Sequence, residues 1–398
     1  MSFQQALFKN ISVINVGYMR GSDKISMGRL ALKERKIFFE YTVDFLKTGF
    51  ELSPFKLPLK PGIIPCEDRV FEGLFGVFND SLPDGWGRLL LDRKIMKLGM
   101  HPGALSPLDR LRYVGSRGMG ALVYEPEIEN ITTVHHEDLD EIADETLQFQ
   151  ENDDDQFIDE LLVMNGSSAG ARPKILVNID GEDWIIKFRS SLDLKDSGPI
   201  EYAYHLMAME ANLNVPEARL FPSKKGPGYF GVKRFDRLEG KRLHMHTMSG
   251  LLHVDHRIPS LDYEMIMKVT LWLTKDVREC EKQFRAAVFN VFSHNRDDHA
   301  KNFSFLMNEN GVWQVSPAYD LTFSFGPSGE HCTMLMGEGK NPSLALLLKL
   351  AEVGGIKKQM ALQIINEIQQ AVSKWKKFST DAGVTKTSRS MISSHIMD

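Results

Sequence analysis

The sequence predicts an α+β protein of more than one domain, with short strands early in the chain and helices toward its end. Three observations predict this class. The chain has 398 residues, more than one compact core usually holds. Residues 6–60 alternate short apolar and polar runs, such as ISVINVGY and KIFFEYTVDF, which is typical of strands. From about residue 262 the apolar spacing is mostly helical. We expect three units, at residues 1–125, 126–240 and 241–398.

The first unit is predicted to be β-rich, with two helices before its last strand. One helix lies in DSLPDGWGRLLLDRKIMKLG, where Asp84 is a candidate N-cap and Gly99 ends the helix. The second helix lies in SPLDRLRYVG, and ALVYEP then reads as a strand.

The second unit is predicted to be a small β lobe with one long helix. It opens with an acidic stretch, residues 136–155, which we interpret as a solvated helix face and linker. After a helix ending at Gly166 comes SSAGARPK, and then KILVNI and DWIIKFRS flank an Asp-Gly pair that predicts a β-hairpin. A helix opened by Pro199 follows, and EARLF and YFGVKRF complete the strands.

The third unit is predicted to be a larger helical lobe, with amphipathic helices from Leu344 to about Ser393. Its helical pattern is interrupted at residues 292–305, which read FSHNRDDHAKNFSF. This segment concentrates carboxylates, imidazoles and amides between aromatic residues. Three interpretations are open for it: a metal site, an acid–base site, or a solvated loop without a function.

Bulk composition excludes several classes of protein. The net charge of −5 does not indicate a nucleic-acid binder, so contact with DNA would need a local basic patch or a partner. The three cysteines are far apart and form no CxxC pair, which indicates a reducing compartment. The first residues do not have the pattern of a secretory signal, and no run approaches the ~18 apolar residues of a membrane span. We expect a cytoplasmic protein without membrane contact.

The spacing after the polar segment favours the acid–base interpretation. Asp297 lies five residues before Asn302, and the hairpin FSFLM-NENG-VWQVS then delivers Asp320 beyond its second strand. Protein kinases use this order: an Asp that accepts the proton of the attacking hydroxyl, an Asn that holds a metal ion, and an Asp that holds Mg²⁺ between the nucleotide phosphates. We therefore predict Asp297 as the base, and Asn302 and Asp320 as ligands of Mg²⁺.

The rest of a kinase site is predicted in the small β lobe. The small-residue loop SSAGARPK can place backbone N–H groups over the phosphates of ATP. Lys187 is a lone cation on an apolar strand, suited to pair with phosphate, and Glu201 at the start of the next helix could orient it. The strand YFGVKRF could supply the hinge that reads adenine, near Lys233 and Phe235.

At this point the chain resembles the HipA family, the kinase toxins of bacterial toxin–antitoxin pairs. The resemblance rests on SLPDGWGRLLLDR, YVGSRGMGALVYEP, SSAGARPK, VKRFDR, NRDDHAKNFSF and SPAYDL. It implies a bilobal protein-kinase-like fold, preceded by a β-rich subdomain. The same roles follow for Asp297, Asn302, Asp320 and Lys187. The phosphate-binding loop would comprise Ser167, Ser168, Ala169, Gly170, Ala171, Arg172 and Lys174.

The resemblance also implies regulation and partners. Ser167 would be a regulatory phosphorylation site, with Ser168 as the alternative, and the added charge of about −1.5 to −2 would repel the nucleotide. The substrate would be a Ser or Thr of a protein, in known cases an aminoacyl-tRNA synthetase. A small helix-turn-helix antitoxin resembling HipB would bind the chain and carry it to operator DNA, so contact with DNA would be indirect.

Several residues admit a second interpretation. His299, which we place among the nucleotide-binding residues, could be a metal ligand but is expected to order the loop by hydrogen bonds. Lys301 either neutralises phosphate or pairs with a carboxylate. GSRGMG at 115–120 lacks the strand–loop–helix context of a nucleotide site. The four histidines between residues 244 and 256 fit no strong zinc pattern, and we expect an exposed strand and loop there.

Three other functions compete with a protein kinase. A kinase acting on a small molecule would share Asp297, Asn302 and Asp320. A non-catalytic, kinase-shaped partner of an antitoxin would not need the lysine and the three polar residues together. A metal phosphohydrolase using Asp297, Asp298 and His299 would leave SSAGARPK and Lys187 unexplained.

Overall fold

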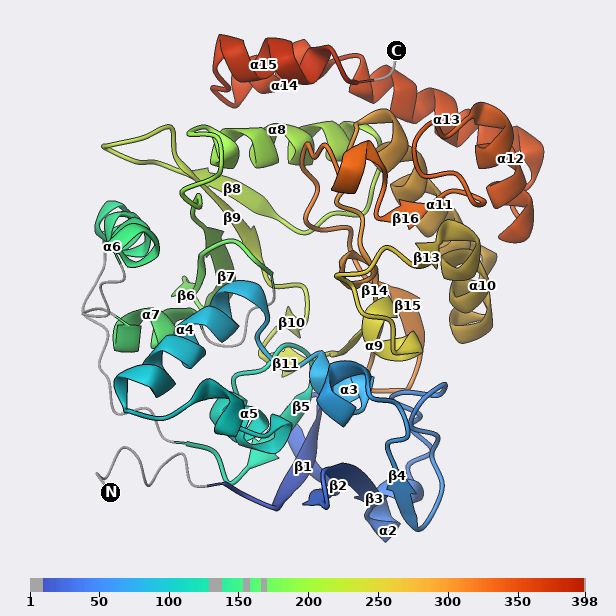
Figure 1. Cartoon of the computed structure of the whole chain (residues 1–398). Helices are drawn as coiled ribbons and strands as arrows, with labels where there is room; N and C mark the ends of the chain where they lie inside the picture. Colours follow the sequence, from blue (N-terminus) through green and yellow to red (C-terminus); the bar gives the residue numbers. More distant parts are fainter. Residues whose placement is uncertain (1–9, 129–137, 153–157, 166–169, 397–398) are drawn as a thin grey trace.

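The first unit is a five-stranded antiparallel sheet accompanied by helices. The structure, a computed structural model, describes residues 10–128, 138–152, 158–165 and 170–396 (Figure 1). The sheet has the order β4-β3-β2-β1-β5. Its strands are β1 (Val13–Arg20), β2 (Asp23–Lys33), β3 (Lys36–Tyr41), β4 (Ile63–Pro65) and β5 (Leu122–Glu125). The helices are α2 (Val43–Leu46), α3 (Gly76–Asn79), α4 (Gly85–Lys97) and α5 (Pro107–Val114).

Alternating side chains bury one face of this sheet. In β3 the buried residues are Ile37, Phe39 and Tyr41, every second position, as the period of a strand requires. They join a core that includes Tyr18, Phe45 and Phe78. The strands predicted at ISVINVGY and KIFFEY are therefore confirmed, whereas Val43–Leu46, at the end of the same predicted run, form helix α2. Residues 47–62 lie outside any helix or strand, and residues 6–9 lie outside the described residues.

A second core joins the first unit to the small β lobe. Trp86, Leu90 and Leu91 of α4 pack in one buried cluster with Ile175 and Ile186 of the small lobe. The same cluster takes in α6 (Leu139–Asn152) and α7 (Ile158–Asn165). Because the buried side chains of α4 pack with those of the small lobe, α4 connects the units rather than lying on the surface of one.

The acidic stretch before the small lobe forms helix α6, which corrects its interpretation as a solvated face and linker only in part. The Asp138 and Asp144 side chains are 38% and 49% exposed, as expected, but others are packed. Residues 136, 137 and 153–155 lie outside the described residues.

The Asp140 side chain of α6 is 4% exposed. It accepts hydrogen bonds from the Lys224 N–H at 2.8 Å and the Tyr229 hydroxyl at 2.7 Å. Partners more than 80 residues away, which no local pattern reveals, turn part of this acidic run toward the protein.

The small lobe is a four-stranded antiparallel sheet, in the order β6-β7-β9-β8, with one long helix beside it. Its elements are β6 (Lys174–Ile179), β7 (Glu182–Lys187), α8 (Ser197–Glu210), β8 (Ala218–Phe221) and β9 (Tyr229–Lys233). The predicted Asp-Gly hairpin is confirmed: Asp180 and Gly181 have φ of 53° and 83°, as a type I′ turn requires. Helix α8 begins two residues before Pro199.

The third unit is the larger lobe and is mainly helical. Its helices are α9 (Met248–Leu252), α10 (Tyr263–Thr274), α11 (Val277–Phe292), α12 (Leu344–Val353), α13 (Lys358–Val372), α14 (Trp375–Asp381) and α15 (Lys386–Ser393). A three-stranded sheet, β12 (His244–Thr247), β14 (Ser304–Met307) and β15 (Trp313–Val315), has the order β12-β14-β15. Two-residue strands form the pairs β10 (Arg237–Leu238) with β11 (Lys241–Arg242) and β13 (Leu261–Asp262) with β16 (Thr333–Met334).

The arrangement of the three units confirms the predicted α+β fold class. A sheet-based small lobe stands beside a helical lobe, and the first unit lies against both of them (Figure 1). The predicted hairpin after Asn302 consists of β14 and β15. The two strands are antiparallel, and Phe305 lies opposite Val315.

The histidine-rich strand is buried, so its prediction as an exposed strand was wrong. His244 and His246 on β12 are 1% and 0% exposed. The Nε2 atom of His244 lies 2.9 Å from the Leu52 carbonyl oxygen, and Nδ1 of His246 lies 2.6 Å from the Asp80 carboxylate. These contacts fasten the first unit to the helical lobe, which explains histidines without a zinc spacing.

We expect the burial of His244 to make the fold sensitive to mild acid. Burial, with a smaller contribution from His246, lowers the pKa of His244 from 6.5 to about 3. At pH values between about 3 and 6.5, His244 is protonated in the unfolded chain but not in the folded protein. The folded state therefore loses stability as pH falls below 6.5. Through His244, the free energy of unfolding should fall by about 2 kcal/mol between pH 7 and pH 5.

Urea unfolding at pH 7 and pH 5 checks this prediction. The variant His244→Gln keeps a donor for the Leu52 carbonyl but has no group that titrates in this range. Its stability should depend less steeply on pH than that of the wild type. Equal pH dependence in the two proteins would contradict the prediction.

Candidate active site

A buried lysine at the end of β7 stands at the centre of the candidate site. The Lys187 side chain is 11% exposed, and its Nζ lies 2.7 Å from Oε2 of Glu201 on α8. It also forms an ion pair with Asp320. Burial alone would lower the pKa of Lys187, but the Asp320 and Glu201 carboxylates outweigh it and raise the pKa. The predicted pairing of Glu201 with Lys187 is confirmed.

Asp320 follows β15 and is carried to Lys187 by the hairpin. Its backbone adopts a positive φ of 54°, a left-handed conformation that Asp tolerates better than most residues. Burial would raise the pKa of its carboxyl, but Lys187 and Lys174 hold the pKa well below its ordinary value. Asp320 is therefore an ionised carboxylate inside the site.

Asn302 ends the polar segment and is tied back to its beginning. Its Nδ2 donates to the Asp297 carbonyl oxygen at 2.7 Å, and its N–H donates to the His299 carbonyl oxygen at 2.8 Å. These bonds close the loop into a turn of 3₁₀ helix, residues Ala300–Asn302. The predicted five-residue spacing therefore corresponds to a compact loop.

The two adjacent aspartates of this loop have different surroundings. Asp298 is 1% exposed and accepts hydrogen bonds from the Tyr263 hydroxyl at 2.6 Å and the Thr333 N–H at 3.2 Å, with His331 Nδ1 at 2.9 Å. Its carboxylate is committed to holding the loop in place.

Asp297, by contrast, has an edge open to solvent. Partial burial raises the pKa of its carboxyl, and the Asp320 charge acts in the same direction, while His299 and Arg172 oppose it. A carboxylate that is accessible and more basic than usual suits proton transfer. The geometry thus separates an exposed carboxylate, Asp297, from a buried structural neighbour, Asp298.

The end of the small-residue loop lies over the same site. Arg172 donates to Glu201 at 3.0 Å and contacts Asp193 at 3.1 Å. Lys174 is 5% exposed, and burial lowers its pKa although the Asp320 carboxylate opposes this. Gly170 and Ala171 are described as well, while Ser167, Ser168 and Ala169 lie outside the described residues.

The predicted adenine contacts differ from one another in the structure. The Lys233 side chain pairs with Glu182, and its N–H donates to the Glu217 carbonyl at 2.8 Å. Phe235 instead packs against Tyr319, with ring centroids 5.4 Å apart, next to Asp320. Of the two, Phe235 is the better placed to meet a nucleotide, and its contact with adenine stays a prediction.

The imidazole of His299 does not order the loop as expected. Its ring lies against His256, with centroids 5.3 Å apart. Within the described part of the chain its buried Nδ1 has no hydrogen-bond partner. The backbone carbonyl of His299, rather than its ring, supports the turn.

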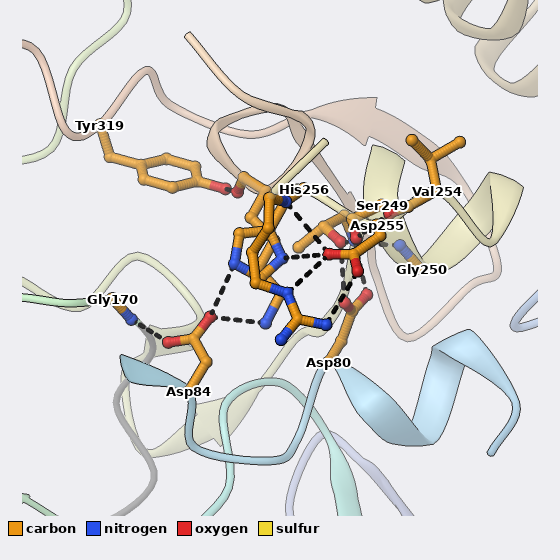
Figure 2. Close-up of polar contacts among 12 residues, drawn as sticks. Asp80, Asp84, Gly170, Ser249, Gly250, Val254, Asp255, His256 and Tyr319 are labelled. Carbon is orange, nitrogen blue, oxygen red and sulfur yellow. Dashed lines mark hydrogen bonds and ion pairs between the residues drawn. The ribbon is translucent and has the colours of Figure 1, made fainter. Parts of the chain in front are cut away.

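Sequence reasoning missed the importance of Asp84. It is the N-cap residue of α4, but its side chain makes no capping hydrogen bond. The carboxylate instead accepts from the Gly170 N–H, and Lys301 Nζ lies 2.6 Å from it. Figure 2 shows Asp84 between Gly170 and His256. The alternative left open for Lys301 is thus decided in favour of a carboxylate pair.

The GSRGMG segment contacts arginine side chains. Arg237 donates to the Gly118 carbonyl at 2.8 Å and to the Gly120 carbonyl at 3.0 Å. The Gly120 N–H donates to Asp236 at 2.7 Å. The motif VKRFDR therefore docks on this segment of the first unit.

Two oxygen-bearing side chains of the candidate site suit a magnesium ion as ligands. Asn302 supplies an amide oxygen and Asp320 an ionised carboxylate, and Mg²⁺ prefers such hard oxygen ligands together with substrate phosphates. Within the described residues, no cluster of three or more His, Cys, Asp or Glu side chains is placed to bind a metal. None of the described helices is long and apolar enough to cross a membrane.

The chain has a kinase-like bilobal fold. Its small β lobe carries the lysine–glutamate pair, and its helical lobe carries the aspartate-bearing loop and hairpin. Family models then assign the chain more closely. Residues 22–125 match the HipA N-terminal domain, and residues 166–375, more than half of the chain, match the HipA-like C-terminal domain. The chain belongs to the HipA family, as its motifs predicted.

Comparison with individual proteins agrees with this assignment. The HipA chain of a complex from Shewanella oneidensis MR-1, solved with HipB and operator DNA, has a TM-score of 0.69 and 16% identity, over 96% of this chain and 94% of that one. This likeness shows the fold. Two proteins of Sinorhizobium fredii, Y4dM and Y4mE, whose names give kinase as a provisional activity, are each 28% identical. The matches cover 35% and 45% of this chain and 37% and 47% of those relatives, so the chain spans less than half of their length.

Proposed function

We propose that this protein is an ATP- and Mg²⁺-dependent kinase that phosphorylates a serine or threonine hydroxyl of a protein. The observation that carries the proposal is the set of contacts at Lys187. One ammonium group is held by Glu201 and Asp320, and Asp297 lies close enough to Asp320 for their charges to interact. Asn302 closes the loop that bears Asp297. A binding module has no need of this combination, whereas phosphoryl transfer needs each part.

The proposed reaction assigns one task to each group. Lys187 and the loop from Gly170 to Lys174 bind the phosphates of ATP. Asn302 and Asp320 would hold Mg²⁺, which when bound neutralises charge on the phosphates. The acceptor oxygen attacks the γ-phosphorus, the bond to the β-phosphate oxygen breaks, and ADP leaves. The hydroxyl proton passes to the Asp297 carboxylate.

The environment of Asp298 argues against a metal phosphohydrolase. That reaction would need Asp297, Asp298 and His299 as a shared ligand set. Asp298 is instead buried against Tyr263 and Thr333.

The family supplies further parts of the proposal. We infer autophosphorylation at Ser167, or at the neighbouring Ser168, with loss of ATP binding through charge repulsion. A HipB-like helix-turn-helix antitoxin is the proposed partner, because the related Shewanella HipA forms a complex with HipB and operator DNA. Contact with DNA would then be indirect, in keeping with the net charge of −5. An aminoacyl-tRNA synthetase is the proposed class of protein substrate.

Incubation with ATP and Mg²⁺, followed by peptide mass spectrometry, tests the kinase proposal. We expect phosphate on Ser167 or Ser168 in the wild type and none in the Asp297→Asn variant. Absence of phosphate together with absence of ATP binding would overturn the proposal.

A further inference from the structure

Asp84 of the first unit joins two loops of the candidate site that belong to different lobes. One carboxylate oxygen accepts from the Gly170 N–H, in the phosphate-binding loop. The other lies 2.6 Å from Nζ of Lys301, in the catalytic loop. Figure 2 shows the carboxylate turned toward Gly170 on one side. A single side chain therefore fixes the distance between the loops that would hold the phosphates and carry the base.

The backbone beside Asp84 holds the same loop residue a second time. The Trp86 N–H donates to the Gly170 carbonyl oxygen at 3.1 Å. Both polar groups of the Gly170 backbone are thus bound to one short segment of the first unit. Gly85 permits this approach, since a Cβ there would lie 2.5 Å from Cα of Ala171 and 2.7 Å from the Gly170 oxygen.

The segment that binds Gly170 leads into a helix whose side chains are anchored in a buried core. Trp86 is 3% exposed and packs edge-on against Phe149, with ring centroids 5.4 Å apart. Leu90 and Ile95 of α4 are fully buried. A side chain supported in this way can hold a loop in place, as a surface residue with free rotamers cannot.

The charges at this contact are matched and partly desolvated. The side chains of Lys301 and Asp84 are 9% and 18% exposed. Burial would raise the pKa of Asp84, but Lys301, the Gly170 N–H and Lys174 lower it to about 2. His256 lies farther off, with Nε2 3.9 Å from the carboxylate. The Asp84 carboxylate is therefore ionised at neutral pH, and hydrogen bonds to a charged group are the stronger kind.

We propose that Asp84 is a positioning residue of the kinase site, which sets the phosphate-binding loop in register with the catalytic loop. The inference rests on the proposed kinase function. It gives the first unit a direct role in the site. Without Asp84, the Gly170 N–H loses its hydrogen-bond acceptor and Lys301 loses its ion-pair partner. The loop then samples positions in which the γ-phosphate is misplaced relative to Asp297, and small misplacements are costly to phosphoryl transfer.

Initial rates of autophosphorylation of the full-length protein, measured at a series of ATP concentrations, test this role. Asp84→Ala is expected to raise the apparent KM for ATP about tenfold and to lower kcat/KM on the order of 100-fold. Asp84→Asn, which keeps the shape but not the charge, should show a smaller effect in the same direction. Combining Asp84→Asn with Lys301→Met should add little to either single change, because both act on one contact.

Asp80 supplies a matched control from the same interface. Its carboxylate accepts from the Thr247 N–H at 2.8 Å and the Thr247 hydroxyl at 2.7 Å, and it contacts neither loop residue. Asp80→Asn should lower the melting temperature at least as much as Asp84→Asn while KM for ATP stays unchanged. A purely structural role for Asp84 predicts the same result for both variants.

Two outcomes separate failure of this inference from failure of the proposed function. If the wild type binds ATP and both folded Asp84 variants keep its KM and kcat, the positioning role is overturned and the kinase function stands. If the wild type itself binds no ATP, as measured by the shift of its melting temperature, the kinase function and this inference fall together.

Discussion

Replacing Asp297 by asparagine should lower the rate of phosphoryl transfer about 1,000-fold and leave ATP binding intact. Asparagine has the shape of the carboxylate but cannot take the proton of the acceptor hydroxyl. Lys187, which is proposed to bind the nucleotide, keeps its ion pairs with Asp320 and Glu201. Single-turnover phosphate transfer, together with a separate titration of ATP, measures the two quantities.

Asp298 is the matched control for this experiment, because it differs in surroundings and not in chemistry. Its carboxylate accepts from Tyr263 and Thr333. Asp298→Asn should therefore lower the melting temperature more than Asp297→Asn does. If Asp297→Asn turned over at the wild-type rate and Asp298→Asn lost its rate at unchanged stability, the base would have been assigned to the wrong residue.

The acid side of the pH–rate profile offers an independent check on the same residue. Burial and the Asp320 charge raise the pKa of Asp297 above 3.8, the ordinary aspartate value. The active form is the carboxylate, so kcat/KM should fall as pH decreases through this raised pKa. The measurement belongs at pH values where the fold is intact, since His244 weakens it in acid.

The parts of the site that the sequence predicted are encoded by local signals. An Asp-Gly pair between apolar runs specifies the hairpin that presents Lys187, and Asn-Glu-Asn-Gly specifies the one that presents Asp320. The six residues from Asp297 to Asn302 close on themselves through two hydrogen bonds that Asn302 donates within the loop. Local chemistry of this kind can be recognised in a single sequence.

The parts that the sequence did not predict depend on contacts between distant segments. Asp84 looked like a helix cap because Ser, Thr, Asn and Asp are common there, yet its partners are 86 and 217 residues away. His246 looked exposed, yet it is paired with Asp80, 166 residues away. A polar residue is ambiguous in a single sequence. The residue type is the same whether the side chain is exposed to solvent or buried and hydrogen-bonded to a distant partner.

Asp236 is the residue whose loss should most destabilise the whole fold. It is 0% exposed and accepts from Arg234 at 2.8 and 2.9 Å, from Arg237 at 2.7 Å and from the Gly120 N–H at 2.7 Å. Burial would raise its pKa, but the two guanidinium groups hold the pKa well below the ordinary value. The carboxylate is thus the only negative charge in direct contact with both arginines among the described residues.

Asp236→Asn should lower the free energy of unfolding by about 3–5 kcal/mol, because it leaves buried cations without their counter-charge. Glu217→Gln is the control, since Glu217 forms a comparable pair with Arg219, at 2.7 Å, but both side chains are about half exposed. That change should have little effect, as is usual for surface ion pairs. Urea unfolding of the three proteins measures the difference.

The same experiment shows whether the first unit and the two lobes unfold together. Arg234 and Arg237 both donate to the Gly118 carbonyl, so the Asp236 cluster ties the small lobe to the first unit. With α4 of the first unit packed in one core with the small lobe, one cooperative transition is expected in the wild type. If Asp236→Asn unfolds in two steps, the cluster is what couples the units. A variant as stable as the wild type would contradict the assignment of a buried charge network, because such a network cannot lose its central carboxylate without cost.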